Sequence, residues 1–250
     1  MEQKALQESR SLLSGTTSKT NATSSYDNAI QQVDHKLEEL DVLDAILKAE
    51  EDPYFFLTTF CYTLDQHDHD HPIKLFPSLD YIRFFAYEFI NEKKLLVEKS
   101  RQMIVTWTFV ALCLWDTMFH KGKLTFFQSK KEEDANALVD RAKFIYRHLP
   151  KLIQDKYPTK QPFTYMKLTF PFQESEIRAT PQGPEQIRMH TSSNIFSDEM
   201  AFQEEARNAY AAAKPTIDGG GRFIGVSTAN GKNFFYRLSH DLEGVYNPEK

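Results

Sequence analysis

From residue 76 onward, short apolar segments alternate with longer segments that have helical periodicity. The apolar segments "KKLLVEK" and "KLTFFQS" are each followed by a segment whose apolar residues stand three or four positions apart. Strands that alternate with helices form a mostly parallel sheet with helices on its faces, because parallel neighbours need a crossover connection. The sequence therefore predicts an α/β core over residues 76–250.

Two other parts of the chain depart from this alternation. The stretches "FTYMKLTFP" and "SEIRATP" have a period of two around a short turn, which predicts a β-hairpin insertion. Residues 27–75 have apolar residues at helical spacing and then "DPYFFLTTFCYTL", so we expect an N-terminal helical segment made of two helices. Residues 1–26 are rich in small polar residues, and we expect them to form a disordered arm.

Composition limits the class of protein. The net charge is -5, so the whole chain does not attract nucleic acid by charge, and any such contact needs a local basic patch or an assembly. Cys61 and Cys113 do not make a disulfide framework, which favours a reducing, cytoplasmic setting. The longest apolar run, residues 107–115, is too short to span a bilayer, so we expect no membrane contact and read the run as a buried helix.

The loop "DQHDHDHP", residues 65–72, has the residue types of a metal site. In an extended loop, however, His67, His69 and His71 would point to opposite sides, and the aspartates between them would compete as ligands. We therefore favour a solvated loop over a divalent metal site.

Polar clusters follow three of the expected strands, and ligands on parallel sheets bind where the strands end. The first cluster, in "EKSRQMIVTW", lies between a strand and a helix, where a phosphate loop is found. Thr106 supplies a hydroxyl for Mg²⁺, but the stretch has no glycine, so an ordinary strand–helix turn remains the alternative. The candidate nucleotide-binding residues are Lys99, Ser100, Arg101, Gln102, Met103, Ile104, Val105 and Thr106.

The second cluster is Asp198-Glu199, after "NIFS". An aspartate at a strand end can hold Mg²⁺ through water, and the adjacent glutamate can polarise an attacking water; an acid-rich helix start is the alternative. The third cluster, "STANG", has a strand-end hydroxyl pair and a tight turn that could sense a γ-phosphate, although a capped turn is the simpler reading. Its residues are Ser227, Thr228, Ala229, Asn230 and Gly231.

The order and spacing of the three clusters are more specific than any one of them. Across residues 50–240 the pattern resembles the ATPase domain of viral terminase large subunits, the DNA-packaging motors of tailed phages and herpesviruses. Phosphate loops of that family often read Arg-Gln-x-Gly-Lys-Ser/Thr, and its coupling motif often reads Ser-Thr-Pro-x-Gly-x-Asn-x-Phe-Tyr. The matching residues here are Arg101, Gln102, Thr106, Asp198, Glu199, Ser227, Thr228, Gly231, Asn233, Phe235 and Tyr236, whereas Ile104, Val105 and Ala229 depart from the family pattern.

The resemblance implies a P-loop NTPase fold of the RecA/ASCE type that uses ATP and Mg²⁺. It implies that Thr106 and Asp198 hold the metal, that Glu199 is catalytic, and that Ser227–Gly231 couples hydrolysis to movement. Arg188 is the candidate arginine finger, with Arg178 as its competitor. For the missing phosphate-loop lysine, we expect Arg101 as the replacement and Lys99 as the second choice.

The resemblance also implies partners and a location. These are double-stranded DNA, a portal protein, a small terminase subunit and a ring of identical subunits, in the cytoplasm of an infected host cell. We expect the isolated domain to be a monomer, and we expect no C-terminal nuclease domain within these 250 residues. Two alternatives stay open: a helicase-like nucleic-acid ATPase, and a catalytically weak or dead scaffold, which Ile104-Val105 favours.

Overall fold

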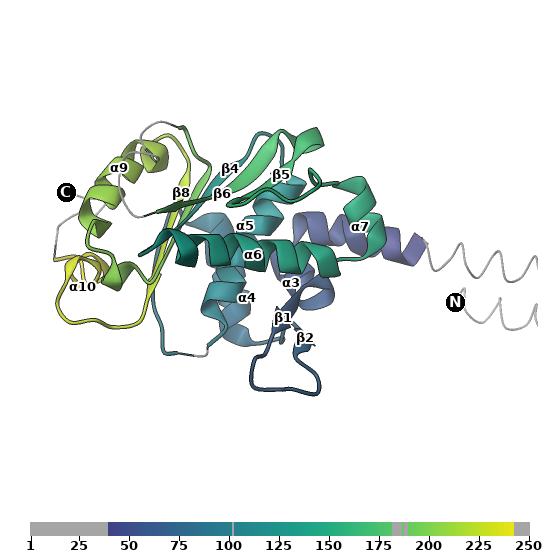
Figure 1. Cartoon of the computed structure of the whole chain (residues 1–250), viewed down its shortest axis with the longest axis horizontal. Coiled ribbons are helices and arrows are strands. Elements are labelled where there is room, and N and C mark those ends of the chain that lie inside the picture. The colour runs from purple at the N-terminus through teal and green to yellow at the C-terminus, as the bar shows by residue number, and fades with distance from the viewer. Residues whose placement is uncertain (1–39, 102, 182–186, 188–189, 243–250) are drawn as a thin grey trace, which may run out of the picture. The chain divides into compact units, whose positions relative to one another are not determined.

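The computed structural model describes residues 40–101, 103–181, 187 and 190–242 (Figure 1). The chain divides into two compact units, residues 1–47 and 48–250. In the first unit the described residues, 40–47, are helical. The expected disordered arm lies outside the described residues, as does most of the first expected helix.

In the second unit, residues 48–51 are helical, and helix α3 (Pro53–Phe60) follows. The helix begins with the side chain of Asp52, which accepts a hydrogen bond of 3.0 Å from the Phe55 amide, followed by proline at the first position. The sequence prediction of a helix through residue 64 was wrong. Residues Tyr62–Leu64 form strand β1, antiparallel to β2 (Ile73–Leu75), because pairing with a distant segment overrides the local apolar spacing.

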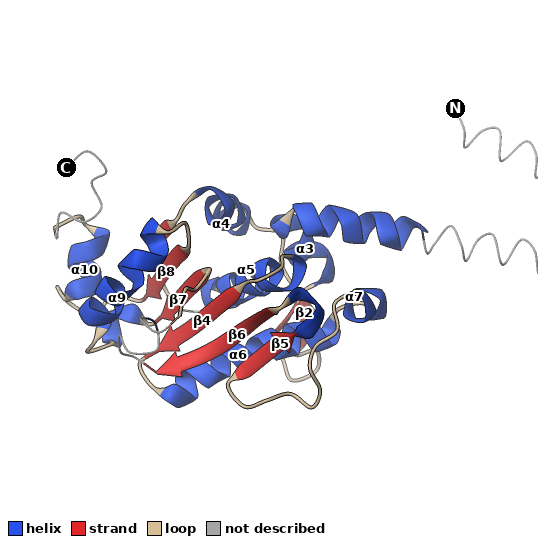
Figure 2. Ribbon diagram, turned by 90° about the horizontal axis from the view of Figure 1, so that it is seen from above, coloured by secondary structure: helices blue, strands red, loops and turns tan. Residues whose placement is uncertain are grey.

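The main sheet has six strands in the order β3-β8-β7-β4-β6-β5 (Figure 2). All neighbouring pairs are parallel except β5–β6, which is antiparallel. This confirms the predicted mostly parallel sheet and the predicted hairpin, whose second strand also pairs with β4 inside the sheet. The strands are β3 (Lys94–Glu98), β4 (Leu124–Ser129), β5 (Lys167–Phe170), β6 (Ser175–Pro181), β7 (Asn194–Asp198) and β8 (Arg222–Ser227).

Helices cover both faces of this sheet. Phe196 and Phe223 are one position out of register on the neighbouring strands β7 and β8, so their side chains point to opposite faces. Phe109 of α5 contacts Phe196, whereas Tyr210 of α9 contacts Phe223, which places these two helices on opposite sides of the sheet. The helices of the sheet domain are α4 (Asp80–Asn91), α5 (Val105–Phe119), α6 (Glu132–His148), α7 (Lys151–Lys156), α9 (Ala206–Asp218) and α10 (Phe234–Ser239), with short 3₁₀ turns at Pro171–Gln173 and Met200–Phe202.

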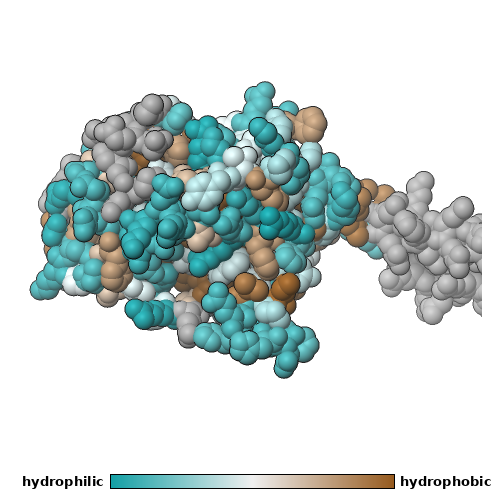
Figure 3. All heavy atoms as spheres, viewed as in Figure 1, coloured by the Kyte–Doolittle hydropathy of each residue, from teal (hydrophilic) through white to brown (hydrophobic). Residues whose placement is uncertain are grey.

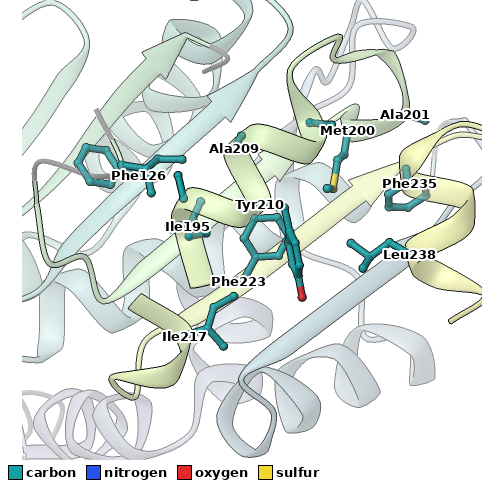
Figure 4. Packing of buried hydrophobic residues seen from close by; sticks show 14 residues of the cluster. Phe126, Ile195, Met200, Ala201, Ala209, Tyr210, Ile217, Phe223, Phe235 and Leu238 are labelled. Atoms are coloured by element: carbon teal, nitrogen blue, oxygen red, sulfur yellow. The ribbon is translucent and has the colours of Figure 1, made fainter. Parts of the chain in front are cut away.

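The hydrophobic core explains why α5 lacks a polar face. Thirteen consecutive or near-consecutive residues of this helix are buried, since other helices and the sheet surround it. On the opposite face of the sheet, α9 and α10 pack through Tyr210, Phe235 and Leu238 against Phe223 and Ile195 (Figure 4). The core therefore fixes the starts of α5 and α10, which both lie next to the polar clusters.

The described surface is mostly hydrophilic on the side shown in Figure 3, with an apolar patch just above the polar loop that joins β1 and β2. Leu64, Ile73 and Leu75 are the exposed apolar residues of these two strands. Among the described helices, none is both long enough and apolar enough to cross a membrane.

Candidate functional site

The three polar clusters meet at the carboxyl edge of the sheet. Strand β8 lies between β3 and β7, and its last residue, Ser227, is opposite Glu98 in register. Asp198, the last residue of β7, is opposite Val226 on the other side of β8. The segments that follow the three strands are therefore neighbours in space although the strand ends, Glu98, Asp198 and Ser227, are far apart in sequence.

The glycine-free loop before α5 keeps a conformation that normally favours glycine. Ile104 precedes the helix with φ 57° and ψ 4°, in the left-handed region, which a β-branched residue rarely adopts. It occupies the position where the family pattern has glycine. At the other end of the loop, the amide of Lys99 donates to the Ser227 carbonyl at 3.0 Å, and in between the Tyr81 hydroxyl donates to the Met103 carbonyl at 3.0 Å.

Lys99 lies at the centre of the site. Its Nζ atom is 2.9 Å from Thr106 Oγ1, 3.1 Å from Glu199 Oε1 and 3.6 Å from Asp198 Oδ1. The Thr106 hydroxyl also contacts both carboxylate oxygens of Asp198, at 3.1 and 3.3 Å. Lysine, threonine and the acid pair thus form one connected cluster, as the sequence pattern predicted for Thr106, Asp198 and Glu199.

The cluster favours Lys99, and not Arg101, as the cation of the loop. Arg101 and Ser100 are exposed, and among the described residues no ion pair involves Arg101. Gln102 lies outside the described residues. Val105 stands where the family pattern has lysine, and its side chain is only 2% exposed, so this position faces the core. The geometry thus places Lys99 in the cluster and Arg101 at the surface, while the role of Arg101 in phosphate binding stays a prediction.

Burial affects the pKa of Asp198. Asp198 is 7% exposed, and this burial raises its pKa above the ordinary value. Glu199 raises the pKa further, whereas Lys99, Arg141 and the Thr106 hydroxyl act in the opposite direction. The aspartate is further fixed by Gln203, whose Nε2 atom donates to the Asp198 carbonyl at 2.8 Å.

The segment after β8 holds the glutamate. The hydroxyls of Ser227 and Thr228 lie 3.5 and 3.3 Å from Glu199 Oε2. Asn230 and Asn233 donate their side-chain amides to the carbonyl of Ala201, at 3.0 and 2.6 Å.

The other residues of this turn determine its backbone conformation and begin the next helix. Gly231 has φ 68°, which suits glycine, and Ala229 is exposed. Asn233 also caps α10 by accepting a hydrogen bond of 3.1 Å from the Tyr236 amide. The expected coupling residues therefore connect Glu199 to a separate helix.

The two arginine-finger candidates differ in what the structure describes. Arg188 lies outside the described residues. Arg178, on β6, forms an ion pair with Glu176 and lies 3.4 Å from His190 Nε2, so its guanidinium is engaged within the chain. The structure therefore gives no reason to prefer Arg178 for a contact with another subunit.

Two cavities adjoin the cluster. The smaller has a volume of about 200 Å³ and is lined by loop residues 99–100 and 103–106 together with Trp107 and Arg141. The larger has a volume of about 650 Å³ and is lined by β1, β2 and the loop between them, and again by Ile104, Trp107 and Arg141. The sequence analysis did not predict Arg141, on α6, or Gln203 as site residues. Neither belongs to a local motif, and only the fold brings Arg141 to the cavities and Gln203 to Asp198.

The metal-binding groups of the site are few. Among the described residues, no three histidine, cysteine, aspartate or glutamate side chains gather where they could hold a metal ion. In the loop after β1, Asp65 and Asp68 both pair with Lys74, at 2.7 and 3.0 Å. Thr106 and Asp198, with neighbouring oxygen atoms, suit a hard cation such as Mg²⁺ that completes its shell with water and phosphate oxygens.

The fold of this chain is similar to that of solved phage terminases. The large terminase of bacteriophage HK97 superposes with a TM-score of 0.59 and 13% sequence identity, over 79% of this chain and 42% of that chain. The ATPase domain of the Thermus phage P74-26 large terminase aligns with a TM-score of 0.47 and 16% identity, over 58% of this chain and 63% of that chain. No protein-family model and no curated protein sequence matches the chain.

In both structural matches the aligned region spans less than two thirds of the other protein. At such identities the likeness concerns the fold alone. The α/β domain has the P-loop NTPase fold of terminase ATPase domains, with a six-stranded, mostly parallel sheet flanked by helices.

Proposed function

We propose that this chain is the ATPase motor domain of a phage terminase large subunit, which couples ATP hydrolysis to translocation of double-stranded DNA into a procapsid. The observation that carries the proposal is the convergence of Lys99, Thr106 and the pair Asp198-Glu199 at the carboxyl edge of a P-loop NTPase sheet. A cation, a hydroxyl, a metal-binding acid and a second acid are the groups that phosphoryl transfer to water requires.

Phosphate binding falls to the loop before α5. Lys99 lines the smaller cavity and supplies the positive charge that the family pattern takes from the residue before Thr106. The start of α5, a helix of 15 residues, adds the partial positive charge of its dipole. The larger cavity, which shares Ile104, Trp107 and Arg141 with the smaller one, gives the ribose and base of the nucleotide a place.

Thr106 and Asp198 are the residues of this chain that would hold Mg²⁺, through the hydroxyl and through water, respectively. When bound, Mg²⁺ neutralises charge that develops on the β- and γ-phosphates. The side chain of Asp198 is well placed for this task, because hydrogen bonds from Gln203 and Ser129 to its carbonyl fix the end of the strand.

Glu199 orients the water that attacks the γ-phosphate and accepts its proton. Its carboxylate is held from one side by Lys99 and from the other by Ser227 and Thr228. Loss of the γ-phosphate changes the charge beside Lys99 and Glu199, and the turn after β8 transmits this change to α10 through Asn230 and Asn233. These contacts support a coupling role for residues 227–231.

The full motor would need partners that this chain does not contain. We propose that the chain forms a homo-oligomeric ring and acts with double-stranded DNA, a portal protein and a small terminase subunit. In that ring, Arg188 would be the arginine finger that reaches the ATP of a neighbouring subunit. Two other functions compete with this proposal. The scaffold alternative is favoured by Ile104 and Val105 in place of glycine and lysine, and the helicase-like alternative shares the same strand-end site.

The test is ATP hydrolysis by the purified chain with Mg²⁺, with portal protein and DNA added in a second series. Glu199→Gln is expected to keep ATP binding and to lower turnover at least about a hundredfold, because the amide cannot accept the proton. The matched control is Glu204→Gln, an exposed glutamate five residues further along the chain.

Equal turnover by the wild type and Glu199→Gln would refute the catalytic role of Glu199. If neither series shows ATP binding, the scaffold alternative is correct. Nucleic-acid-dependent turnover that needs no portal protein and moves along RNA would favour the helicase-like alternative.

A further inference from the structure

Arg141 is a cation at the site that no motif of the sequence includes. It lies on α6, and its side chain is half-buried and lines both cavities beside the loop. The guanidinium carbon is 5.4 Å from the ring centre of Trp107, on α5, which is within the range of a cation–π contact. Phe144, one turn further along α6, packs edge-on against the same indole at 5.6 Å.

The charge of Arg141 is not matched by a carboxylate. Among the described residues, no aspartate or glutamate oxygen lies within 4.0 Å of its guanidinium. Burial lowers the pKa of Arg141, and the more distant carboxylate of Asp198 raises it. An arginine side chain stays protonated in proteins, so a half-buried guanidinium without an ion-pair partner is stabilised by any anion that enters the cavity beside it.

The smaller cavity defines where that anion would lie. Its wall contains Lys99, Val105 and Thr106 on the side of the loop and Arg141 on the side of α6. A group that fills about 200 Å³ between these walls touches both of them. A phosphate chain is the anion of matching chemistry, because a guanidinium binds two phosphate oxygens at once.

We propose that Arg141 is a second phosphate-binding residue, which acts on the nucleotide bound by its own subunit and is held in place by the indole of Trp107. The inference rests on the proposed function, since it assigns one more contact to the same nucleotide. Lys99 and Arg141 together then provide the charge that a lysine in the place of Val105 would provide in the family pattern. Arg141 differs from Arg188, which is the candidate for reaching a neighbouring subunit.

The test uses the fluorescence of Trp107 in the full chain. The only other tryptophan, Trp115, is replaced by Phe to leave a single signal. ATP, AMP and adenosine are titrated in the presence of Mg²⁺ into this background and into Arg141→Ala and Arg141→Lys. Arg147→Ala is the matched control, because Arg147 is on the same helix but is exposed and stacks on Phe163, away from the cavities.

Arg141→Ala is expected to weaken ATP binding at least about tenfold, since hydrogen bonds to charged groups are lost. Binding of adenosine is expected to change less than twofold, and the loss for AMP to lie between the two. Arg141→Lys is expected to recover part of the loss, because it restores the charge without the planar fork. Arg147→Ala is expected to bind ATP like the background protein.

Three results would overturn the inference. If Arg141→Ala binds ATP as tightly as the background protein, Arg141 is not a phosphate ligand, and the proposed function still stands. If adenosine binding falls as much as ATP binding, Arg141 supports the shape of the pocket instead. If the unchanged chain binds no ATP either alone or with portal protein and DNA, both this inference and the proposed function fail.

Discussion

The loop before α5 combines a left-handed turn with a nearby cation, although it lacks the glycine and lysine of the family pattern. Ile104 takes up the left-handed backbone conformation that a glycine would adopt at the same position. Lys99 brings a charge from the start of the loop, while Val105, in the lysine position, is buried. The loop therefore has a left-handed turn and a nearby positive charge without a glycine at position 104 or a lysine at position 105.

The positive φ angle of Ile104 predicts that glycine is more stable than alanine at this position. Inside a helix alanine is favoured over glycine, whereas at the residue before a helix glycine is already preferred. At φ 57°, glycine avoids the clash of a Cβ atom, so Ile104→Gly is expected to be more stable than Ile104→Ala by about 1 kcal/mol. Urea unfolding of the two variants measures the difference. A more stable alanine variant would show that the left-handed turn does not persist in solution.

The position of Lys99 predicts which cation ATP requires. Lys99→Ala is expected to weaken Mg²⁺-ATP binding at least about tenfold, because its ammonium is the charge nearest to Thr106. Arg101→Ala, at an exposed position two residues away, is expected to change binding less than threefold. Calorimetric titration of both variants compares them directly. The reverse order would restore Arg101 as the replacement for the missing lysine.

At the scale of elements, contacts between neighbouring helices and turns hold the site together. Tyr81 on α4 reaches the Met103 carbonyl, so a helix that precedes β3 supports the loop that follows it. Asn233, at the start of α10, reaches the Ala201 carbonyl behind Glu199. The loop and the acid pair are therefore each anchored to a helix outside the three strands that carry the clusters.

The hydrogen bond from Tyr81 of α4 to the loop predicts that its loss weakens nucleotide binding. Tyr81→Phe removes only the hydroxyl that donates to Met103, which is worth about 1 kcal/mol of stability. The freed loop is expected to bind Mg²⁺-ATP about three- to tenfold more weakly. Tyr87→Phe on the same helix, where the side chain is 64% exposed, is the control. Equal ATP affinity in the two variants would mean that Tyr81 does not position the loop.

At the scale of the whole sheet domain, the two edges of the sheet have separate tasks. The carboxyl edge carries the candidate site, whereas the amino edge is closed by a buried ion network around Asp116. This aspartate, near the end of α5, contacts His120 at 3.2 Å, Lys123 at 3.3 Å and the Asn194 amide at 2.7 Å. Arg222, 3.9 Å away, connects it to the start of β8.

The Asp116 network predicts how stability depends on pH. Burial alone would raise the pKa of Asp116, but hydrogen bonds from His120 and Asn194 and the charges of Lys123 and Arg222 lower it from 3.8 to about 2. A lowered pKa stabilises the fold above the unfolded value, and this stabilisation is lost as the pH falls through the folded value. The free energy of unfolding is therefore expected to lose about 2 kcal/mol through Asp116 between pH 5 and pH 2.

Comparison with Asp116→Asn isolates this contribution. The difference in unfolding free energy between the wild type and this variant is expected to shrink by about 2 kcal/mol over the same pH range, as guanidinium unfolding at each pH would measure. Asp155→Asn, in an exposed pair with Lys151, is the control and is expected to show a change below about 1 kcal/mol. A constant difference for Asp116→Asn would mean that its carboxylate titrates normally in the folded chain.

The sequence by itself determined the alternation of strands and helices, the hairpin and the three polar clusters. Each of these depends on residues that are close together in the chain: apolar periodicity for α6, period-two spacing for β5 and β6, and strand-end positions for Asp198 and Ser227. Local spacing fixes which face of an element is apolar, and the carboxyl edge of a parallel sheet then collects the strand ends. The sequence therefore predicts that Thr106, Asp198 and Glu199 meet at this edge, and their roles in metal binding and catalysis stay predictions.

Only the tertiary structure decided which cation lies beside Thr106 and the acid pair and which residues surround them. Residues 62–64 became a strand because they pair with residues 73–75, and no local pattern specifies that pairing. The packing of helices against the sheet places Lys99, and not Arg101, beside Thr106. The same packing brings Arg141 of α6 to the cavities. A side chain's direction at such a site is set by contacts between segments far apart in sequence, and local periodicity does not contain that information.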